Sequence, residues 1–275
     1  MKRISILLLV GTTAIALLFS SATAQNKQWK PGSRAPQAGD EYVNPKDGTV
    51  LVFIPGGEFT MGSDSGDADE KPAHKQTVQG FWLGKYEVTN QQYQKFRDAE
   101  GYPDPQAMDD PAFNAPNQPV IGVKFMHAQS YVKWAGLRMP TEAEWEYAAS
   151  GGKNLKYPTK TGEINHDLAN YLGKEGADKW EDVPSPVGSF PPNPFGIYDL
   201  AGNAWEWTSS MYRNYPYSAT DGRENQTDRR HRVMRGGTFH FGEKYIRTTH
   251  RHHFAMHLRL DYAGMRMAAS TDQLK

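Results

Sequence analysis

The weak periodicity of the second half of this sequence restricts its fold more than any other feature. After Gly152 the apolar pattern of helices and strands fades for roughly a hundred residues, and short strands are expected again only in roughly the last forty. The chain of 275 residues contains 7 Trp, 14 Tyr, 26 Gly and 18 Pro, a composition typical of loops held in place by aromatic side chains. We therefore expect one α+β domain with a long irregular middle.

The first half of the chain carries clear local signals for strands and helices. The apolar run 50–54 predicts a buried strand, which a Pro-Gly-Gly turn joins to a second short strand over 58–61. Capping boxes at 89–92 (TNQQ) and 141–144 (TEAE) predict two helices, each ending where glycines follow. A third helix is predicted over 127–135.

The N-terminus has the pattern of a secretory signal. Two basic residues precede the apolar run ISILLLVGTTAIALLF, and the Ala-Thr-Ala triplet at 22–24 is typical of a cleavage site. We expect residues 1–24 to be removed and the mature protein to be periplasmic or secreted, without membrane contact; an uncleaved anchor is the alternative. The polar segment 25–45 is interpreted as a lead-in and 46–275 as the folded domain.

Charge and cysteine content exclude several classes of function. The chain has 31 Lys and Arg against 31 Asp and Glu, so nothing in its charge points to nucleic acid. It contains no cysteine, and therefore offers no disulfide and no thiolate metal ligand. A chain exported unfolded acquires any cofactor outside the cytoplasm, which favours either none or a simple metal ion.

The stretch YDLAGNAWEW can bind a hard cation. Asp199 and Glu206 offer carboxylate oxygens, and the glycine-containing turn between them can point backbone carbonyls inward. Calcium binds about six to eight oxygens, so this loop can form a calcium site on chemistry alone. A metal-free capped turn with two acids is the alternative.

Six motifs, spread in order over residues 50–268, give this chain a family resemblance. They are IPGGEFTMGS, KYEVTNQQYQKF, WAGLRMPTEAEWEYAASGG, PNPFGIYDLAGNAWEWTS, RVMRGG and GMRMA. The chain thus resembles the formylglycine-generating enzyme (sulfatase-modifying factor) family. The resemblance implies an α+β domain of C-type-lectin-like topology with little regular secondary structure.

The resemblance also implies structural calcium at two sites. The first would use the side chains of Asp199 and Glu206 and the carbonyls of Gly202 and Ala204. The second would use the side chain of Asn170, the carbonyl of Tyr171, the side chain of Asp178 and the carbonyl of Trp180. Metal-free loops held by Trp packing are the alternative at both sites.

Family members that oxidise a substrate cysteine to formylglycine hold copper with two cysteines after the RGG motif. These positions fall near Phe241 and Ile246, so this chain is not expected to be a generator of the copper type. Other branches oxidise the chromophore of pyoverdine siderophores in the periplasm, form sulfoxides with an added iron-binding domain, or bind ligands without catalysis. We expect oxidative modification of an exported peptide or peptide-derived metabolite, such as a siderophore precursor; a non-catalytic ligand-binding or accessory module is the alternative.

The segment 223–259 is crowded with Arg and His. Basic residues outnumber acids there, which predicts a groove that attracts an anionic ligand such as a carboxylate or phosphate. If THRHHF forms a strand, His250 and His252 share one face, and His240 could complete a three-nitrogen site for copper, zinc or iron. A basic surface whose arginines pair with the acidic stretch DSGDADE is the third interpretation.

Candidate site residues follow from this chemistry and from the resemblance. Thr238 stands where the family has an active-site Ser, Arg251 matches a functionally important Arg, and Tyr262 replaces a frequent Asn. The catalytic candidates are His240, Glu243, His250, Arg251 and Tyr245. The expected substrate-binding residues are Thr238, Arg247, His252 and Tyr262.

Overall fold

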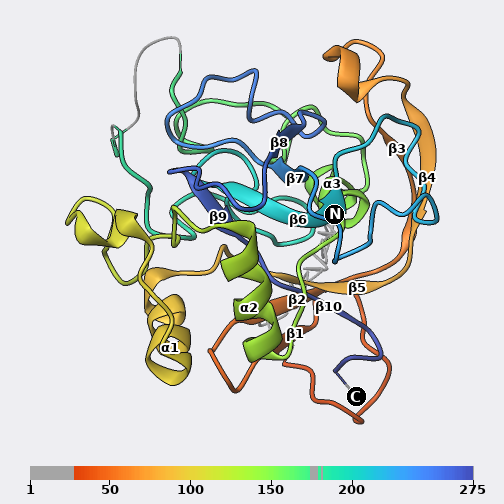
Figure 1. The fold of residues 1–275 in the computed structure, drawn as a ribbon. Coiled ribbons are helices and arrows are strands. Elements are labelled where there is room, and N and C mark those ends of the chain that lie inside the picture. Colours follow the sequence, from red (N-terminus) through yellow and green to blue (C-terminus); the bar gives the residue numbers. More distant parts are fainter. Residues whose placement is uncertain (1–27, 174–178, 181, 275) are drawn as a thin grey trace, which may run out of the picture.

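The computed structural model describes residues 28–173, 179–180 and 182–274 (Figure 1). Its helices are α1 (Asn90–Glu100), α2 (Phe125–Ala135) and α3 (Glu142–Ala149), with short 3-10 turns at Ala68–Glu70 and Gln106–Asp109. Its strands are β1 (Glu41–Val43), β2 (Val50–Ile54), β3 (Gly57–Met61), β4 (His74–Val78), β5 (Phe81–Gly84), β6 (Trp205–Met211), β7 (Arg232–Arg235), β8 (His252–Phe254), β9 (Ala263–Met265) and β10 (Ala268–Ser270). The predicted signal peptide at 1–24 lies outside the described residues, and none of the described helices is long and apolar enough to cross a membrane.

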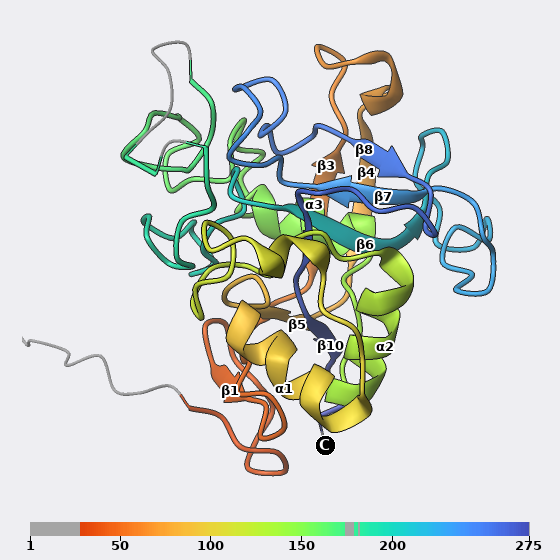
Figure 2. The same ribbon diagram turned by 60° about the vertical axis from the view of Figure 1, so that its left-hand side comes forward.

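Three small sheets organise the described chain. The first has the strand order β1-β2-β5-β10, the second is the β3-β4 ribbon, and the third has the order β8-β7-β6-β9. Strands β6 and β9 pair in parallel, whereas the other described pairs are antiparallel. Figure 1 shows the third sheet crossing the middle of the molecule, with the β3-β4 ribbon on one side and α1 and α2 on the other. Figure 2 shows the irregular chain after α3, coloured green to teal, as loops beside this sheet.

Strand β6 lies at the centre of the core. Trp205 and Trp207 are no more than 1% exposed, and Phe125 of α2 packs edge-on against Trp207 with ring centroids 5.6 Å apart. Trp207 Nε1 donates to the carbonyl of Val123 at 2.8 Å, so the buried N–H keeps a partner. These contacts attach α2 to the third sheet.

The capping boxes and the first predicted strands form as expected. Thr89 Oγ1 accepts a hydrogen bond from the Gln92 amide at 3.3 Å, and Thr141 Oγ1 accepts one from the Glu144 amide at 3.1 Å. Strand β2 coincides with the predicted 50–54, and α2 begins at Phe125 rather than at 127. The α+β class with little regular secondary structure is confirmed.

Two elements differ from the sequence prediction. The boundary at 46 lies inside the fold, because Trp29 is 6% exposed, packs 5.0 Å from Trp82, and is followed by β1 at the edge of the first sheet. Strand β6 falls inside the middle that was expected to be irregular. Its residues are buried on both faces, so the alternation that reveals a half-exposed strand is absent.

Candidate functional site

The loop after β7 sets the positions of most predicted site residues. Gly236 and Gly237 have φ values of 96° and 79°, and a Cβ on Gly237 would lie 2.5 Å from Ile246 Cγ2. Glycine is needed here because any larger residue would push the segment at Gly237 away from the segment at Ile246. Thr238 follows with 0% exposure, so its hydroxyl lies beneath the surface rather than in an open groove.

His240 and Tyr262 meet at the solvent-facing edge of this loop. Their rings stack with centroids 5.1 Å apart, and Phe239 packs edge-on against Tyr262 at 5.2 Å. His240 Nδ1 pairs with Asp182 Oδ1, and both side chains reach solvent. A carboxylate only accepts hydrogen bonds, so Nδ1 is the donor in this pair, and in the neutral ring Nε2 is the acceptor.

Tyr262 also lines a cavity of about 540 Å³. Its walls are formed by Ala107, Asp109, Asp110, Pro111, Phe113, Ile121, Arg259, Asp261 and Tyr262. Phe113 and Tyr262 contribute aromatic rings, while three carboxylates face one guanidinium, that of Arg259, which lies 2.8 Å from Asp261 Oδ1. This lining favours a planar ligand that carries positive charge.

A second cavity, of about 750 Å³, borders the same segment at residues 244–249. Its walls are formed by Thr60, Gly62, Ser63, Ser65, Gly66, Asp67, Glu146, Ser150, Asn154, Leu155, Lys156, Lys244, Arg247, Thr248 and Thr249. Arg247 contacts both oxygens of Glu70, at 2.6 and 2.9 Å, and Lys244 Nζ lies 3.0 Å from Asp67 Oδ1. The positive charges on this wall are therefore largely compensated by carboxylates of the protein itself.

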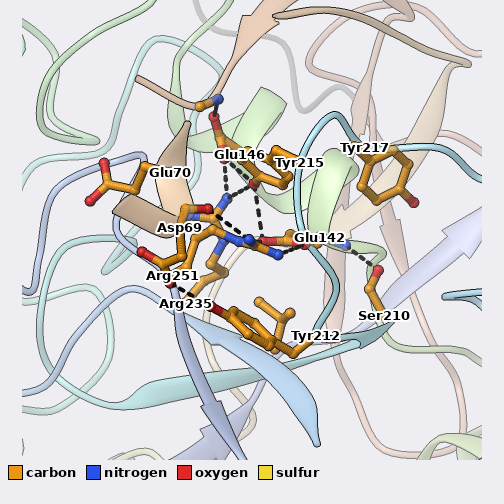
Figure 3. A network of polar contacts seen from close by, with 12 residues as sticks. Asp69, Glu70, Glu142, Glu146, Ser210, Tyr212, Tyr215, Tyr217, Arg235 and Arg251 are labelled. Carbon is orange, nitrogen blue, oxygen red and sulfur yellow. Dashed lines mark hydrogen bonds and ion pairs between the residues drawn. The ribbon is translucent and has the colours of Figure 1, made fainter. Parts of the chain in front are cut away.

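The arginines that suggested an anion-binding groove are paired inside the protein. Figure 3 shows Arg235 and Arg251 among the carboxylates of Glu142 and Glu146. Arg251 Nε lies 2.6 Å from Glu142 Oε1, and Arg235 pairs with Glu146. Arg232 donates to three backbone carbonyls instead. The expected basic groove therefore does not form. The prediction of an anionic ligand rested on that groove and loses its support, whereas the lining of the cavity at Tyr262 favours a cationic group.

The predicted three-nitrogen metal site does not form either. His252 begins β8 and stacks on Trp205 at 4.9 Å, whereas His250 precedes the strand and His240 lies in the earlier loop, which is not a strand. Among the described acidic and histidine side chains, one group of three has ligand atoms within 4.8 Å of one another: Asp67, Glu70 and His250.

This group of three is a network of ion pairs and hydrogen bonds. Both oxygens of the buried Glu70 are used, by Arg247 and by Thr249 Oγ1 at 2.7 Å. His250 is 7% exposed, and its Nδ1 has no hydrogen-bond partner and lies 3.5 Å from Asp67 Oδ2. Burial lowers the pKa of His250 to about 4, so the ring is neutral at pH 7. The guanidinium already supplies the positive charge that a cation would bring.

The other two catalytic candidates lie at the surface. Glu243 lines a surface cavity next to Leu172, and Tyr245 is 36% exposed. Tyr245 packs against Phe241 at 5.0 Å. The resemblance places the copper-binding cysteines near Phe241 and the buried Ile246, and this chain has no cysteine there or elsewhere.

Asp182, Phe113 and Asp110 were not predicted from the sequence. Asp182 reaches His240 across 58 positions, from the part of the chain without regular periodicity. An excess of acids near Pro111 was the available signal for the acidic wall, but nothing in the sequence tied it to Tyr262.

Two of the predicted calcium ligands fit a cation, and a third does not. Oδ1 of Asp199 and Oδ1 of Asn170 are buried acceptors that receive no hydrogen bond. Burial raises the pKa of Asp199 to about 6, as expected for a carboxylate short of positive charge. Glu206 instead gives its oxygens to Arg266 and to Trp145 Nε1, at 2.6 to 3.0 Å.

The two predicted calcium loops lie against each other. Asn170 and Gly202 form a β-bridge, and a Cβ on Gly202 would lie 1.9 Å from the Asn170 carbonyl oxygen. The Ala204 amide donates to the buried Glu87 at 3.0 Å, so a further carboxylate lies beside the first predicted calcium loop. Tyr171 is buried and Trp180 half-buried, while Asp178 lies outside the described residues.

The fold and the absence of cysteine define a cysteine-less protein of the formylglycine-generating-enzyme type. Residues 36–271 match the sulfatase-modifying factor enzyme 1-like domain, and the chain belongs to this family. The family and the fold predicted from the motifs are thereby confirmed.

Individual relatives show how far the similarity extends. Serine/threonine-protein kinase Pkn1 of Chlamydia trachomatis serovar L2 is 35% identical over 226 residues, which cover 74% of this chain but 35% of the kinase. The chain thus spans about a third of the length of these kinases. Mouse formylglycine-generating enzyme is 31% identical over 253 residues, covering 72% of this chain and 68% of the enzyme. The structure of PvdO from Pseudomonas aeruginosa aligns with a TM-score of 0.73 at 29% identity, covering 86% of this chain and 100% of that chain.

Proposed function

We propose that this protein oxidatively modifies an exported peptide-derived small molecule, with a siderophore precursor as the leading example. Membership of the family and the likeness to PvdO, a protein of pyoverdine maturation, support the reaction class. One observation assigns the proposed reaction to particular residues. His240 pairs with Asp182 and stacks on Tyr262, and Tyr262 lines the aromatic and acidic cavity.

The proposed reaction removes two electrons and two protons from an electron-rich ring of the substrate. Dioxygen accepts both electrons and both protons and becomes hydrogen peroxide. His240 Nε2 takes the first proton, and the Asp182 carboxylate stabilises the imidazolium that forms. Tyr262 and Phe113 hold the planar ring, and the carboxylates of the cavity hold a cationic group of the substrate.

We further propose that calcium stabilises the fold and that the chain acts after export. Asp199 at the first predicted site and Asn170 at the second would each supply an oxygen to an ion, because each has a buried oxygen that receives no hydrogen bond. The signal-like pattern at 1–24 would direct the protein to the periplasm or outside the cell.

The test uses the mature chain with siderophore-precursor peptides that carry an electron-rich, cationic ring. Oxygen uptake, peroxide release and the loss of two hydrogens by mass are measured together. His240→Gln and Asp182→Asn should each lower kcat about tenfold or more, because the proton acceptor is lost or disoriented, on the scale of general base catalysis. His257→Gln removes an exposed histidine elsewhere and should leave kcat unchanged.

Binding of the precursors is measured in parallel by calorimetry. A protein that binds a precursor without oxygen uptake or mass change is a ligand-binding module, and the enzymatic proposal is then lost. Equal kcat values for wild type and both site variants would overturn the assignment of His240 as the base.

A further inference from the structure

Two histidines outside the cavity at Tyr262 bring their ring nitrogens together on the third sheet. His231 immediately precedes β7, and His253 is the middle residue of β8. Val233 pairs with His253 in the antiparallel register, so His231 is its diagonal neighbour on the same face. The two Nδ1 atoms lie 2.9 Å apart, where one of them donates a proton and the other accepts it.

The same separation suits two ligands of one metal ion. Bonds from a metal to imidazole nitrogen are about 2.0–2.1 Å long, so nitrogens roughly 2.9 Å apart subtend about 90° at the ion. That angle belongs to square-planar or tetragonal copper(II) and nickel(II), whereas a tetrahedral ion needs a wider separation. A metal ion would replace the shared proton after a modest rotation of the rings.

The surroundings keep His253 ready to act as a ligand. The ring of Tyr212 packs on His253 with centroids 3.8 Å apart, and the Tyr212 hydroxyl donates to Asp69 Oδ2 at 3.1 Å. Burial, followed by the nearby His231, lowers the pKa of His253, so its ring is neutral at pH 7. His231 is exposed, which leaves the pair open to solvent.

We propose that His231 and His253 form a surface site for a divalent transition metal ion, with copper(II) and nickel(II) as the fitting class. Among the described acidic and histidine side chains, no third ligand atom completes this pair within 4.8 Å. The remaining coordination positions would therefore be held by water or by a small external ligand. This site is separate from the copper-binding positions of the family, which the resemblance places near Phe241 and Ile246, and it does not depend on the proposed oxidation.

The test adds copper(II) to the untagged mature protein in a non-coordinating buffer. Calorimetry should give one ion per chain with a dissociation constant in the micromolar range, and electron paramagnetic resonance should show two directly bound nitrogens. His231→Gln and His253→Gln should each weaken binding at least tenfold. His257→Gln, which removes another exposed histidine, should bind copper as the wild type does.

Stability controls keep this test decisive. His231 is exposed, so His231→Gln should melt at the wild-type temperature and report on binding alone, even if His253→Gln folds poorly. Wild-type copper affinity in His231→Gln, or no stoichiometric binding by the wild type, would overturn the proposal and leave a hydrogen-bonded pair. Activity plays no part in this readout, so its outcome is independent of the proposed function.

Discussion

Arg251 and Glu142 form a buried, two-point ion pair, with Nε 2.6 Å from Oε1 and Nη2 3.0 Å from Oε2. Glu142 is the first residue of α3 and Arg251 immediately precedes β8, so the pair joins the helix to the third sheet across 109 positions. Neither side chain is exposed to solvent. The arginine that the family resemblance placed among the catalytic residues thus has a structural partner.

Arg251→Met should destabilise the protein strongly because the buried Glu142 loses both of its close guanidinium contacts and keeps only Arg235 Nε, at 3.5 Å, as a charged partner. We expect a loss of about 3–5 kcal/mol in the free energy of unfolding, measured by urea denaturation. The exposed pair Lys75–Glu58 provides the control, and Lys75→Met should cost less than about 1 kcal/mol. If Arg251→Met kept the wild-type stability but lost activity, Arg251 would be assigned to the substrate site and not to a structural role.

His250 should make the stability depend on pH between about 6.5 and 4. Burial holds its folded-state pKa at about 4, below the ordinary value of 6.5. The unfolded chain therefore takes up a proton first as the pH falls, so the contribution is complete above pH 6.5 and is lost towards pH 4. The loss is at most about 3 kcal/mol. Urea denaturation across this range should show a shallower pH slope for His250→Gln, and identical slopes would assign the effect to another group.

Short-range signals in the sequence located several elements closely. The N-terminal ends of α1 and α3 depend on capping residues within one turn of the helix, such as Thr89 with Gln92. These residues can be recognised in the sequence. Strand β1 pairs with β2, and Trp29, whose amide donates to Glu41 of β1, packs against the distant Trp82. Strand β6 is buried on both faces, so it lacks the alternation by which a strand is recognised.

The candidate site was located only as a segment of the chain, because its partners are distant in sequence. Counting charges along 223–259 gave a basic groove, yet Arg247 finds Glu70 across 177 positions and Arg251 finds Glu142 across 109. The sequence shows that arginines are abundant, but only the fold shows which carboxylates compensate them. The same holds for His240, whose partner Asp182 lies in the irregular middle.

Calcium removal should lower the melting temperature if Asp199 binds the ion. An ion that binds only the folded state at a hundred times its dissociation constant contributes about 2.7 kcal/mol. Without calcium, burial raises the pKa of Asp199 to about 6, above its ordinary value of 3.8, so the ionised form destabilises the fold. Acidification from pH 7 towards 4 should relieve that part of the destabilisation, and saturating calcium should abolish this gain.

The calcium prediction is checked by calorimetric melts with and without chelator and by elemental analysis. Asp199→Asn should reduce both the calcium-dependent stabilisation and the gain from acidification. Asp272→Asn, which alters an exposed acid, should behave as the wild type does. The absence of bound calcium, together with melts that do not respond to chelator, would contradict the prediction.

Gly202→Ala should be far more damaging than Gly101→Ala, although both glycines have positive φ values, 77° and 66°. Gly101 ends α1, and nothing lies within 4 Å of an added Cβ. Alanine there should lower the free energy of unfolding by only about 1–2 kcal/mol, because of its left-handed backbone. At Gly202 the added Cβ would lie 1.9 Å from the backbone oxygen of Asn170, and one of the two loops must move. We expect a loss of about 3 kcal/mol or more by urea denaturation, with weaker calcium binding because the bridge between the loops is broken. Similar losses for both variants would mean that the loops can separate freely, and that their contact does not set the positions of Asp199 and Asn170.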